Sequence, residues 1–399
     1  MKFQELQNIC SVRSGGTPSK RDNNLWGDHL PWITAKDLKV PVLRSSLLML
    51  SELGEAKAKI TPADSLLILV RGMTLFKDVP VCLAGRELAF NQDIKALVLD
   101  DGIDPKYVLY YLVGSKHKLM RLVDSAGHGT GRLNTDLLKA FPILLPPLPE
   151  QKAIAAVLST WDAAIEKTER LIEAKERRFR GLMQELIPGA HNNSNRRESR
   201  KVKVGEVCEV ITSNVDKKVH EGEMPVRLCN YMDVYRNYYI TQKLGFMSAS
   251  ASSSEIEKYQ LRVHDVILTK DSETADDIAN SACVLEAPQD LVCGYHLAIL
   301  RPNEELFGPY LNFALHTPRI RYEFSRQANG VTRFGLTMSA YNMVELPLPS
   351  WDEQQAIAEA LTRSQEEITL LKLITEKYKA QKRGLMQKLL TGEWRVNLG

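Results

Sequence analysis

The sequence predicts an α+β protein in which two mixed α/β domains follow one another, each ending in a long helix, with the two helices packed together as a coiled coil. Three observations carry this prediction. The second half of the chain repeats the first at an offset of 203 residues, each half opens with short strand-like runs, and each half closes with a helical repeat of 38 residues. A chain of 399 residues is long enough for two or three domains with cores of their own.

The repeat is clearest in its helical part. Residues 150–187 align without a gap on residues 353–390, with 14 identities in 38 positions, and both segments contain the pentapeptide RGLMQ. Weaker matches continue upstream at the same offset, where Tyr107 aligns with Tyr310. A period of half the chain is too long for a solenoid, whose repeats span about 20 to 50 residues. The pattern therefore indicates an internal duplication.

The first part of each half has the composition of strands separated by turns. The first half contains SLLILVRG, VPVCLAG and IKALVLD, and the second contains MPVRLCN, HDVILTKD and HLAILRP. One helix is expected after these strands in each half, over residues 107–123 and 310–326. A proline-containing segment then precedes each long helix. Proline is well tolerated at a helix start, so these segments are compatible with the predicted helix beginnings. The variable part of each half is thus mixed, and the repeated part is helical.

The predicted boundaries follow these changes in composition. They give a first domain at 1–149, a first helix at 150–187, a linker at 188–203, a second domain at 204–352, a second helix at 353–390 and a tail at 391–399. The linker is rich in Gly, Asn and Ser and has five Arg or Lys residues after Asn195, so it is expected to be exposed. Contact of this basic run with phosphate is the alternative.

Both long helices carry a seam of residues that alternate by three and four positions, as in a coiled coil. The seam of the first helix consists of Ile154, Leu158, Trp161, Ile165, Ile172, Phe179, Leu182 and Leu186. The seam of the second consists of Ile357, Leu361, Ile368, Leu371, Tyr378, Leu385 and Leu389. The alternative is that each helix packs only on its own domain. Because 38 helical residues make a rod of about 57 Å, we expect the two helices to pack against each other.

Composition and motifs exclude several classes of protein. No apolar run reaches the roughly 18 residues of a membrane span, and MKFQELQNIC has no secretory signal, so a cytoplasmic protein is expected. The six cysteines lack the spacing of zinc sites and are expected to be core residues. Phosphate-binding, dinucleotide-binding, metalloprotease and nucleophile-elbow motifs are absent. We therefore predict no catalytic residue and no metal site, with His264 and His296 as structural residues.

The order and duplication of these segments resemble the specificity (S) subunit of type I restriction-modification systems. The segments that carry the resemblance are SGGTPS at 14–19, WGDHLPWITAKDL at 26–38, NQDIKAL at 91–97, the two proline-then-EQ junctions, both RGLMQ helix ends and the closing LLTGEWRV. The resemblance implies a target recognition domain for double-stranded DNA in each half. It also implies that the two helices form an antiparallel coiled coil, which separates the domains, relates them by a pseudo-twofold axis and docks methyltransferase subunits.

The same resemblance implies partners and cofactors. Two methyltransferase subunits would modify adenine with S-adenosylmethionine, and a restriction motor-nuclease subunit, where present, would use ATP and Mg²⁺. This chain would be non-catalytic and would bind none of these cofactors. Its net charge of +3 is low for a stand-alone DNA binder, which fits a subunit whose partners neutralise much of the phosphate charge. The alternative is an assembly scaffold without sequence-specific DNA binding.

Base readout needs Arg, Lys, Asn, Gln, Ser and Thr on loops that face a DNA groove. In the first half the candidate DNA contacts are Ser14, Thr17, Lys20, Arg21, Lys36, Asn91, Gln92, Thr130 and Arg132. In the second half they are Asn214, Lys217, Lys218, Asn230, Arg236, Lys270, Ser272, Thr332 and Arg333. For each of them the alternative is an ordinary solvated loop residue.

Overall fold

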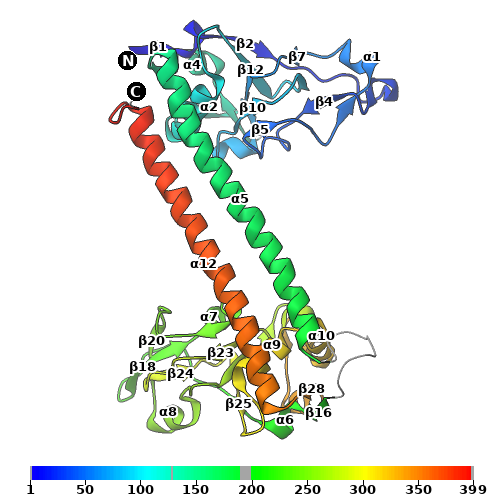
Figure 1. Cartoon of the computed structure of the whole chain (residues 1–399), viewed down its shortest axis with the longest axis vertical. Helices are drawn as coiled ribbons and strands as arrows, with labels where there is room; N and C mark the ends of the chain where they lie inside the picture. Colours follow the sequence, from blue (N-terminus) through cyan, green and yellow to red (C-terminus); the bar gives the residue numbers. More distant parts are fainter. Residues whose placement is uncertain (1, 127–128, 189–198, 397–399) are drawn as a thin grey trace. The chain divides into compact units, whose positions relative to one another are not determined.

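The computed structural model describes residues 2–126, 129–188 and 199–396 (Figure 1). The chain divides into two compact units. Unit 1 comprises Met1–Glu169 and Leu373–Gly399, and unit 2 comprises Arg170–Lys372. Each unit therefore holds one mixed α/β domain and a part of both long helices. The predicted α+β class is confirmed, whereas the units cut across the boundaries that composition suggested.

Unit 1 is built on a five-stranded sheet in the order β2-β12-β8-β10-β5. Its strands are β2 (Cys10–Ser14), β12 (Ile94–Leu99), β8 (Leu66–Leu69), β10 (Val81–Ala84) and β5 (Val42–Leu43). Strand β8, Leu-Leu-Ile-Leu, is fully buried, as expected of a strand covered on both faces. A second sheet has the order β3 (Trp26–Gly27), β6 (Met49–Leu50), β4 (Leu30–Ile33), β11 (Leu88–Phe90) and β7 (Ile60–Thr61), and β1 (Lys2–Glu5) pairs with β15 (Pro142–Leu145).

Unit 2 repeats the main sheet with the same topology, β17-β25-β21-β23-β19. Its strands are β17 (Cys208–Thr212), β25 (Leu297–Pro302), β21 (Val266–Thr269), β23 (Ser281–Val284) and β19 (Tyr239–Ile240). The accompanying sheet has the order β20 (Met247–Ala251), β18 (Met224–Cys229) and β24 (Leu291–Cys293). Strands β21 and β23 match β8 and β10 at an offset of 200, and β25 matches β12 at 203. The duplication thus includes the strands of the main sheet, for which the offset changes from 200 to 203 residues along the chain.

Two expectations for the connecting segments are wrong. The helix expected at 310–326 is broken into α9 (Gly308–Leu315) and α10 (Pro318–Gln327), because Pro318 starts a new helix and Thr317 before it is extended. The helix expected at 107–123 is likewise broken into α2 (Pro105–Gly114) and α3 (Lys116–Met120). The predicted linker is not irregular throughout, because β16 (Arg200–Lys203) pairs with β28 (Glu345–Leu348). Its residues 189–198 lie outside the described residues.

Short helices complete both domains. They are α1 (Glu52–Glu55) and α4 (Thr135–Lys139) in unit 1, and α6 (Val204–Val207), α7 (Tyr231–Tyr235), α8 (Ser253–Tyr259) and α11 (Met338–Tyr341) in unit 2. All six cysteines are buried, as expected of core residues.

The two long helices are α5 (Leu148–Leu186) and α12 (Trp351–Leu390), close to the predicted lengths. None of the predicted seam residues is exposed, as expected of positions that face another part of the protein. In unit 1 the start of α5 pairs antiparallel with the end of α12 (Figure 1). Here Lys379 contacts Glu169 at 2.9 Å, and the Trp161 and Tyr378 rings meet edge to face at 5.7 Å.

In unit 2 the end of α5 pairs antiparallel with the start of α12. Lys175 contacts Glu367 at 2.7 Å, and Lys372 contacts Glu176 at the same distance. The helices also pack on the domains, since Phe179 of α5 lies 6.1 Å from the ring of Phe313 in α9. The two helices pair with each other, and each helix end also enters a domain core. The structure therefore combines the two alternatives for the seam.

The repeated proline-then-EQ junction has a structural explanation. Gln151 accepts a hydrogen bond from the Asp104 amide at 2.9 Å and donates one to the Pro146 carbonyl at 2.9 Å. At an offset of 203, Gln354 accepts from the Phe307 amide at 2.8 Å and donates to the Pro349 carbonyl at 3.1 Å. Both glutamines are buried. Each glutamine thus fastens the start of a long helix to the loop before α2 or α9.

Replacing Gln354 with alanine is expected to destabilise unit 2 by roughly 1 to 3 kcal/mol, because a buried amide and buried carbonyls lose their partner. Gln151→Ala should cost unit 1 a similar amount. Urea unfolding of the purified chain measures both effects, and Gln355→Ala, at the exposed neighbouring position, is the matched control. Equal unfolding midpoints for Gln354→Ala and Gln355→Ala would contradict the assignment.

Candidate nucleic-acid interface

In unit 1 the loop after β2 and the turn before β12 bring several candidates together. Ser14 accepts a hydrogen bond from the Lys95 ammonium at 2.5 Å, and Thr17 donates one to Gln92 at 2.6 Å. Asn91 is buried, and its side chain accepts from the Asp93 amide, which shapes the turn. Ser14, Thr17 and Gln92 remain exposed. This turn and loop form one polar edge of the domain.

A small sheet continues this edge. It has the order β13 (Val123–Ala126), β14 (Thr130–Leu133) and β9 (Arg71–Gly72), and Arg132 lies opposite Arg71 across the strand pair. The carbonyl of Asp93 accepts hydrogen bonds from the Val70 and Arg71 amides at 2.8 and 3.3 Å. Thr130 and Arg132 therefore lie on a sheet that joins the turn holding Gln92.

The other three candidates of unit 1 lie on neighbouring loops. Lys20 is exposed, with its ammonium 5.7 Å from the Trp32 ring centroid, and Arg21 is the next residue. Lys36 is exposed in the turn after β4, where Thr34 accepts from its amide.

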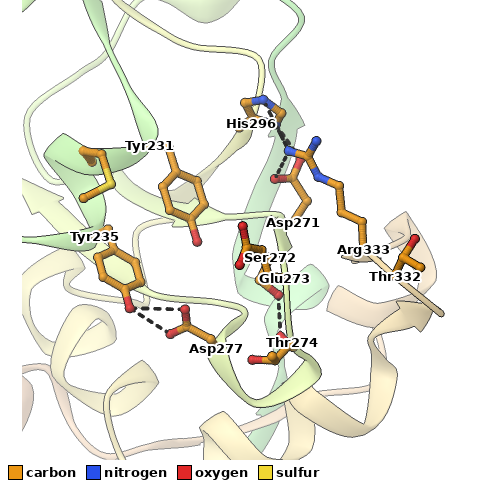
Figure 2. Close-up of a pocket in the computed structure, with 11 residues that line it drawn as sticks. Tyr231, Tyr235, Asp271, Ser272, Glu273, Thr274, Asp277, His296, Thr332 and Arg333 are labelled. Atoms are coloured by element: carbon orange, nitrogen blue, oxygen red, sulfur yellow. Dashed lines mark hydrogen bonds and ion pairs between the residues drawn. The ribbon is translucent and has the colours of Figure 1, made fainter. Parts of the chain in front are cut away.

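In unit 2 three candidates meet around one pocket of about 770 Å³, and a fourth lies next to its wall (Figure 2). Ser272, Thr332 and Arg333 line it, and Lys270 precedes its wall at Asp271. The wall belongs to a sheet with the order β22 (Asp271–Ser272), β27 (Phe334–Gly335) and β26 (Asn329–Gly330). Lys270 itself turns inward, donating to the Ser213 carbonyl at 2.9 Å, and burial lowers the pKa of its ammonium group.

A cluster of charged groups closes one side of the pocket (Figure 2). Asp271 contacts the His296 ring at 2.6 Å and the Arg333 guanidinium at 3.1 Å. Only 19% of the Asp271 and His296 side chains is exposed, whereas 62% of Arg333 is. Arg333 is thus held in place by the carboxylate and still faces solvent. His296, which is predicted to be structural, lines the pocket through its contact with Asp271.

Two tyrosines from α7 line the other side of the pocket. Tyr231 and Tyr235 stack with ring centroids 5.6 Å apart, and the Tyr235 hydroxyl donates to Asp277 at 3.1 Å. This hydrogen bond raises the pKa of Tyr235, and burial, followed by the charge of Asp277, raises the pKa of Tyr231 to about 12. Both phenols therefore stay protonated near neutral pH and can donate hydrogen bonds.

The remaining candidates of unit 2 lie on nearby or separate loops outside the pocket lining. Asn230 precedes α7 and its amide donates to Asp233 at 2.8 Å, while exposed Arg236 follows the same helix. Asn214 is exposed beside Ser213, whose carbonyl accepts from Lys270. Lys217 and Lys218 are exposed on the following turn. The candidate contacts did not include the lining residues Asp271, Glu273 and Asp277, because the selection was made among basic, amide and hydroxyl side chains.

The small sheets of the two units occupy the same place in the duplicated fold. The Leu69 amide donates to Pro80 and the Thr269 amide to Asn280, at 3.1 and 2.9 Å. The Val70 amide donates to Asp93, and the Lys270 amide to His296, at 2.8 and 3.1 Å. Finally, the Leu133 amide donates to Val70 and the Leu336 amide to Lys270, at 2.9 and 2.8 Å. The equivalent positions lie 200 residues apart for Leu69 and Val70 and 203 residues apart for Asp93 and Leu133.

The described residues hold no group of three or more His, Cys, Asp or Glu side chains suited to a metal ion. Within the same part of the chain, no helix is both long and apolar enough to cross a membrane.

Comparison with known proteins defines the class to which this duplicated fold belongs. A family model described as type I restriction modification DNA specificity domain matches residues 1–176 and again residues 197–379. The chain therefore belongs to the family of type I restriction-modification specificity proteins.

Relatives agree over most of the chain. A putative type I restriction enzyme specificity subunit, MjaX of Methanocaldococcus jannaschii, is 24% identical over 410 aligned residues, covering 99% of this chain and 94% of that protein. A type I restriction enzyme specificity subunit of Escherichia coli is 29% identical over 187 residues, covering 45% and 46%. The crystal structure of the type I S subunit from M. genitalium has the same fold, with a TM-score of 0.61, 15% identity and coverage of 98% and 96%.

Proposed function

We propose that this chain is the specificity subunit that selects a bipartite DNA target for a type I restriction-modification complex. The observation that carries the proposal is the occurrence, at one equivalent place in both domains, of a small sheet whose polar side chains face solvent. Each sheet presents an exposed arginine, Arg132 or Arg333, with Thr130 or Thr332 nearby. Arginine is the residue that most often makes specific contacts with guanine in the major groove.

The candidate DNA contacts of both halves remain a proposal with a chemical rationale. Exposed lysines such as Lys36, Lys217 and Lys218 suit phosphate contacts, which position a protein without reading sequence. The chain is proposed to be non-catalytic and to bind no cofactor. S-adenosylmethionine, ATP and Mg²⁺ would be used by the methyltransferase and restriction subunits.

Co-expression with a methyltransferase subunit of the same system, followed by genome-wide mapping of modified adenines, tests this function. One split motif, with two short half-sites around a fixed gap, is the expected result. A stable complex that modifies no fixed sequence would refute it and favour the scaffold alternative.

The proposed partners are two identical methyltransferase subunits, each docked on one copy of RGLMQ. Only 14 of 38 positions match between the helical repeats, and five of them are these consecutive residues. Gly181 and Gly384 are exposed, and a Cβ added to either would meet no atom within 4 Å. Glycine costs about 1 kcal/mol relative to alanine inside a helix. A partner backbone that approaches both helices closely would explain why glycine stands in each copy.

Replacing Gly181 with tryptophan is therefore expected to remove one methyltransferase subunit from the complex, and Gly384→Trp the other. The double variant should bind none, because the added ring fills the space that the partner would occupy. Native mass spectrometry of the assembled complex gives the stoichiometry. Leu370→Trp, at a position of α12 that is 56% exposed, is the control, and full stoichiometry in the double variant would contradict the docking site.

A further inference from the structure

The two units carry loops of equal length at the same place, and these loops have opposite chemistry. Residues 71–80 lie between β8 and β10, and residues 271–280 lie between β21 and β23. The first loop has two basic residues and one acidic residue, whereas the second has four acidic residues and no basic one. Equivalent backbone hydrogen bonds hold both loops at the same place in the fold. The difference between the loops therefore lies in the contacts that their side chains can make.

The acidic loop of unit 2 supplies hydrogen-bond acceptors to the pocket (Figure 2). Asp271 is engaged by His296 and Arg333. Asp277 accepts from Tyr235 and from Asn280, the latter at 3.3 Å, and an ionised carboxylate has about four acceptor sites. Glu273 is exposed at the same pocket. The pocket therefore places hydrogen-bond acceptors beside the aromatic rings of Tyr231 and Tyr235 in α7.

The equivalent loop of unit 1 cannot offer the same contacts. Met73 occupies the position of Glu273 and is 74% exposed, and Phe76 occupies that of Asp276 and is 48% exposed. Lys77 stands where unit 2 has Asp277. The first loop therefore presents apolar and cationic groups at the place where the second presents carboxylates.

We propose that the pocket of unit 2 reads an amino-bearing base edge, adenine N6 or cytosine N4, in one half of the DNA target. The inference rests on the proposed function and assigns the chemistry of a single half-site. Both amino groups are donors in the major groove, where carboxylates accept from cytosine and amide side chains pair with adenine. Glu273 and Asp277 are the accepting residues, Arg333 donates to an adjacent acceptor, and Asp271 is a positioning residue that holds Arg333.

A cationic protein segment is the competing occupant, since aromatic and acidic side chains also attract cations. The lining favours DNA. Arg333 stands on the wall that contains Asp271, so the pocket presents a guanidinium donor as well as carboxylate acceptors. The hydroxyl groups of Thr332 and Tyr231 add further donors, whereas the Tyr235 hydroxyl is already donated to Asp277. A mixture of donors and acceptors matches the edges of base pairs better than it matches a single positive charge.

Selection from DNA with randomised half-sites tests the inference on the full chain assembled with its methyltransferase subunits. The variants are Glu273→Gln and Asp277→Asn, and Glu257→Gln, exposed on α8 and outside the pocket lining, is the matched control. Both variants should lower the preference for an amino-bearing base about 5- to 150-fold at a position of one half-site. The other half-site and the control should be unchanged, and the wild-type motif distinguishes adenine from cytosine.

Three results would overturn the inference. Unchanged preferences in both variants would show that the carboxylates read nothing. A uniform gain in affinity for all sequences would show that they only repel phosphate. Loss of the methyltransferase subunits would identify the pocket as a protein-binding site. A wild-type complex without preference in either half-site would instead refute the proposed function itself.

Discussion

Replacing Leu158 with alanine is expected to destabilise unit 1 by about 2 to 5 kcal/mol, the usual range for a leucine truncated in a packed core. Leu158 is fully buried in a cluster that contains Ile154 of the same helix and Leu389 of α12. The resulting cavity would weaken the α5–α12 pairing and the domain core at once. Native-state hydrogen exchange, resolved by peptide, should show lost protection in residues 2–126 and in the end of α12, with the sheet of unit 2 unaffected.

Leu361→Ala is the mirror experiment, because Leu361 lies 203 positions on and is fully buried in the core of unit 2. Protection should then fall in the sheet of unit 2 and in the end of α5. Leu171→Ala and Leu370→Ala are controls, since those side chains are 45% and 56% exposed and surface changes usually stay within about 0.5 kcal/mol. Equal loss of protection in both units from Leu158→Ala would show that the units do not unfold separately.

Exchanging residues 1–145 for the corresponding domain of another specificity subunit is expected to change one half of the DNA target completely and to leave the other half intact. The cut falls after β15, where the chain enters α5. The first domain has its own five-stranded sheet, and the helix residues that enter its core, such as Leu158 and Leu389, stay in the exchanged chain. Mapping modified adenines with the exchanged chain and the original partner is the measurement.

The structure specifies which contacts the incoming domain must keep. The Tyr110 hydroxyl donates to Asp162 of α5 at 2.7 Å. Gly114 faces α12 so closely that an added Cβ would lie 3.1 Å from Leu390. A donor domain with both residues retained should be active, and one with a bulky residue at position 114 should not assemble. A changed motif in both halves would contradict independent reading by the two domains.

The repeated parts of the fold were predictable because the same sequence pattern occurs in both halves of the chain. The seam of α5 and α12 could be read from periodicity, and the strand-like runs became β8, β10, β12, β18, β21 and β25. Periodicity could not reveal that α5 ends in unit 2, since it reports which face is apolar but not which domain covers that face. The single helix expected at 310–326 was wrong because the stop at Pro318 received too little weight.

The candidate DNA contacts were harder to predict than the fold. Sequence analysis selected Ser272, Thr332 and Arg333 as separate candidate DNA contacts, and the structure brings these three around one pocket. It gave no reason to select Asp277, because the contact of this residue with Tyr235 depends on how α7 packs beside the acidic loop. Residue type alone also could not show that Asn91 is buried within its own turn.

Unit 1 combines residues from the first and the last part of the chain, and this affects its folding during translation. Its domain is encoded first, yet its core is completed by Met386, Leu389 and Leu390 at the end of α12. At the usual 5 to 20 residues per second, a ribosome needs roughly 10 to 50 s to reach them after leaving the first domain. During that time the apolar face around Tyr110 lacks its cover in the nascent chain. A premature stop codon near the 3′ end of the gene would therefore damage first the domain that is translated first.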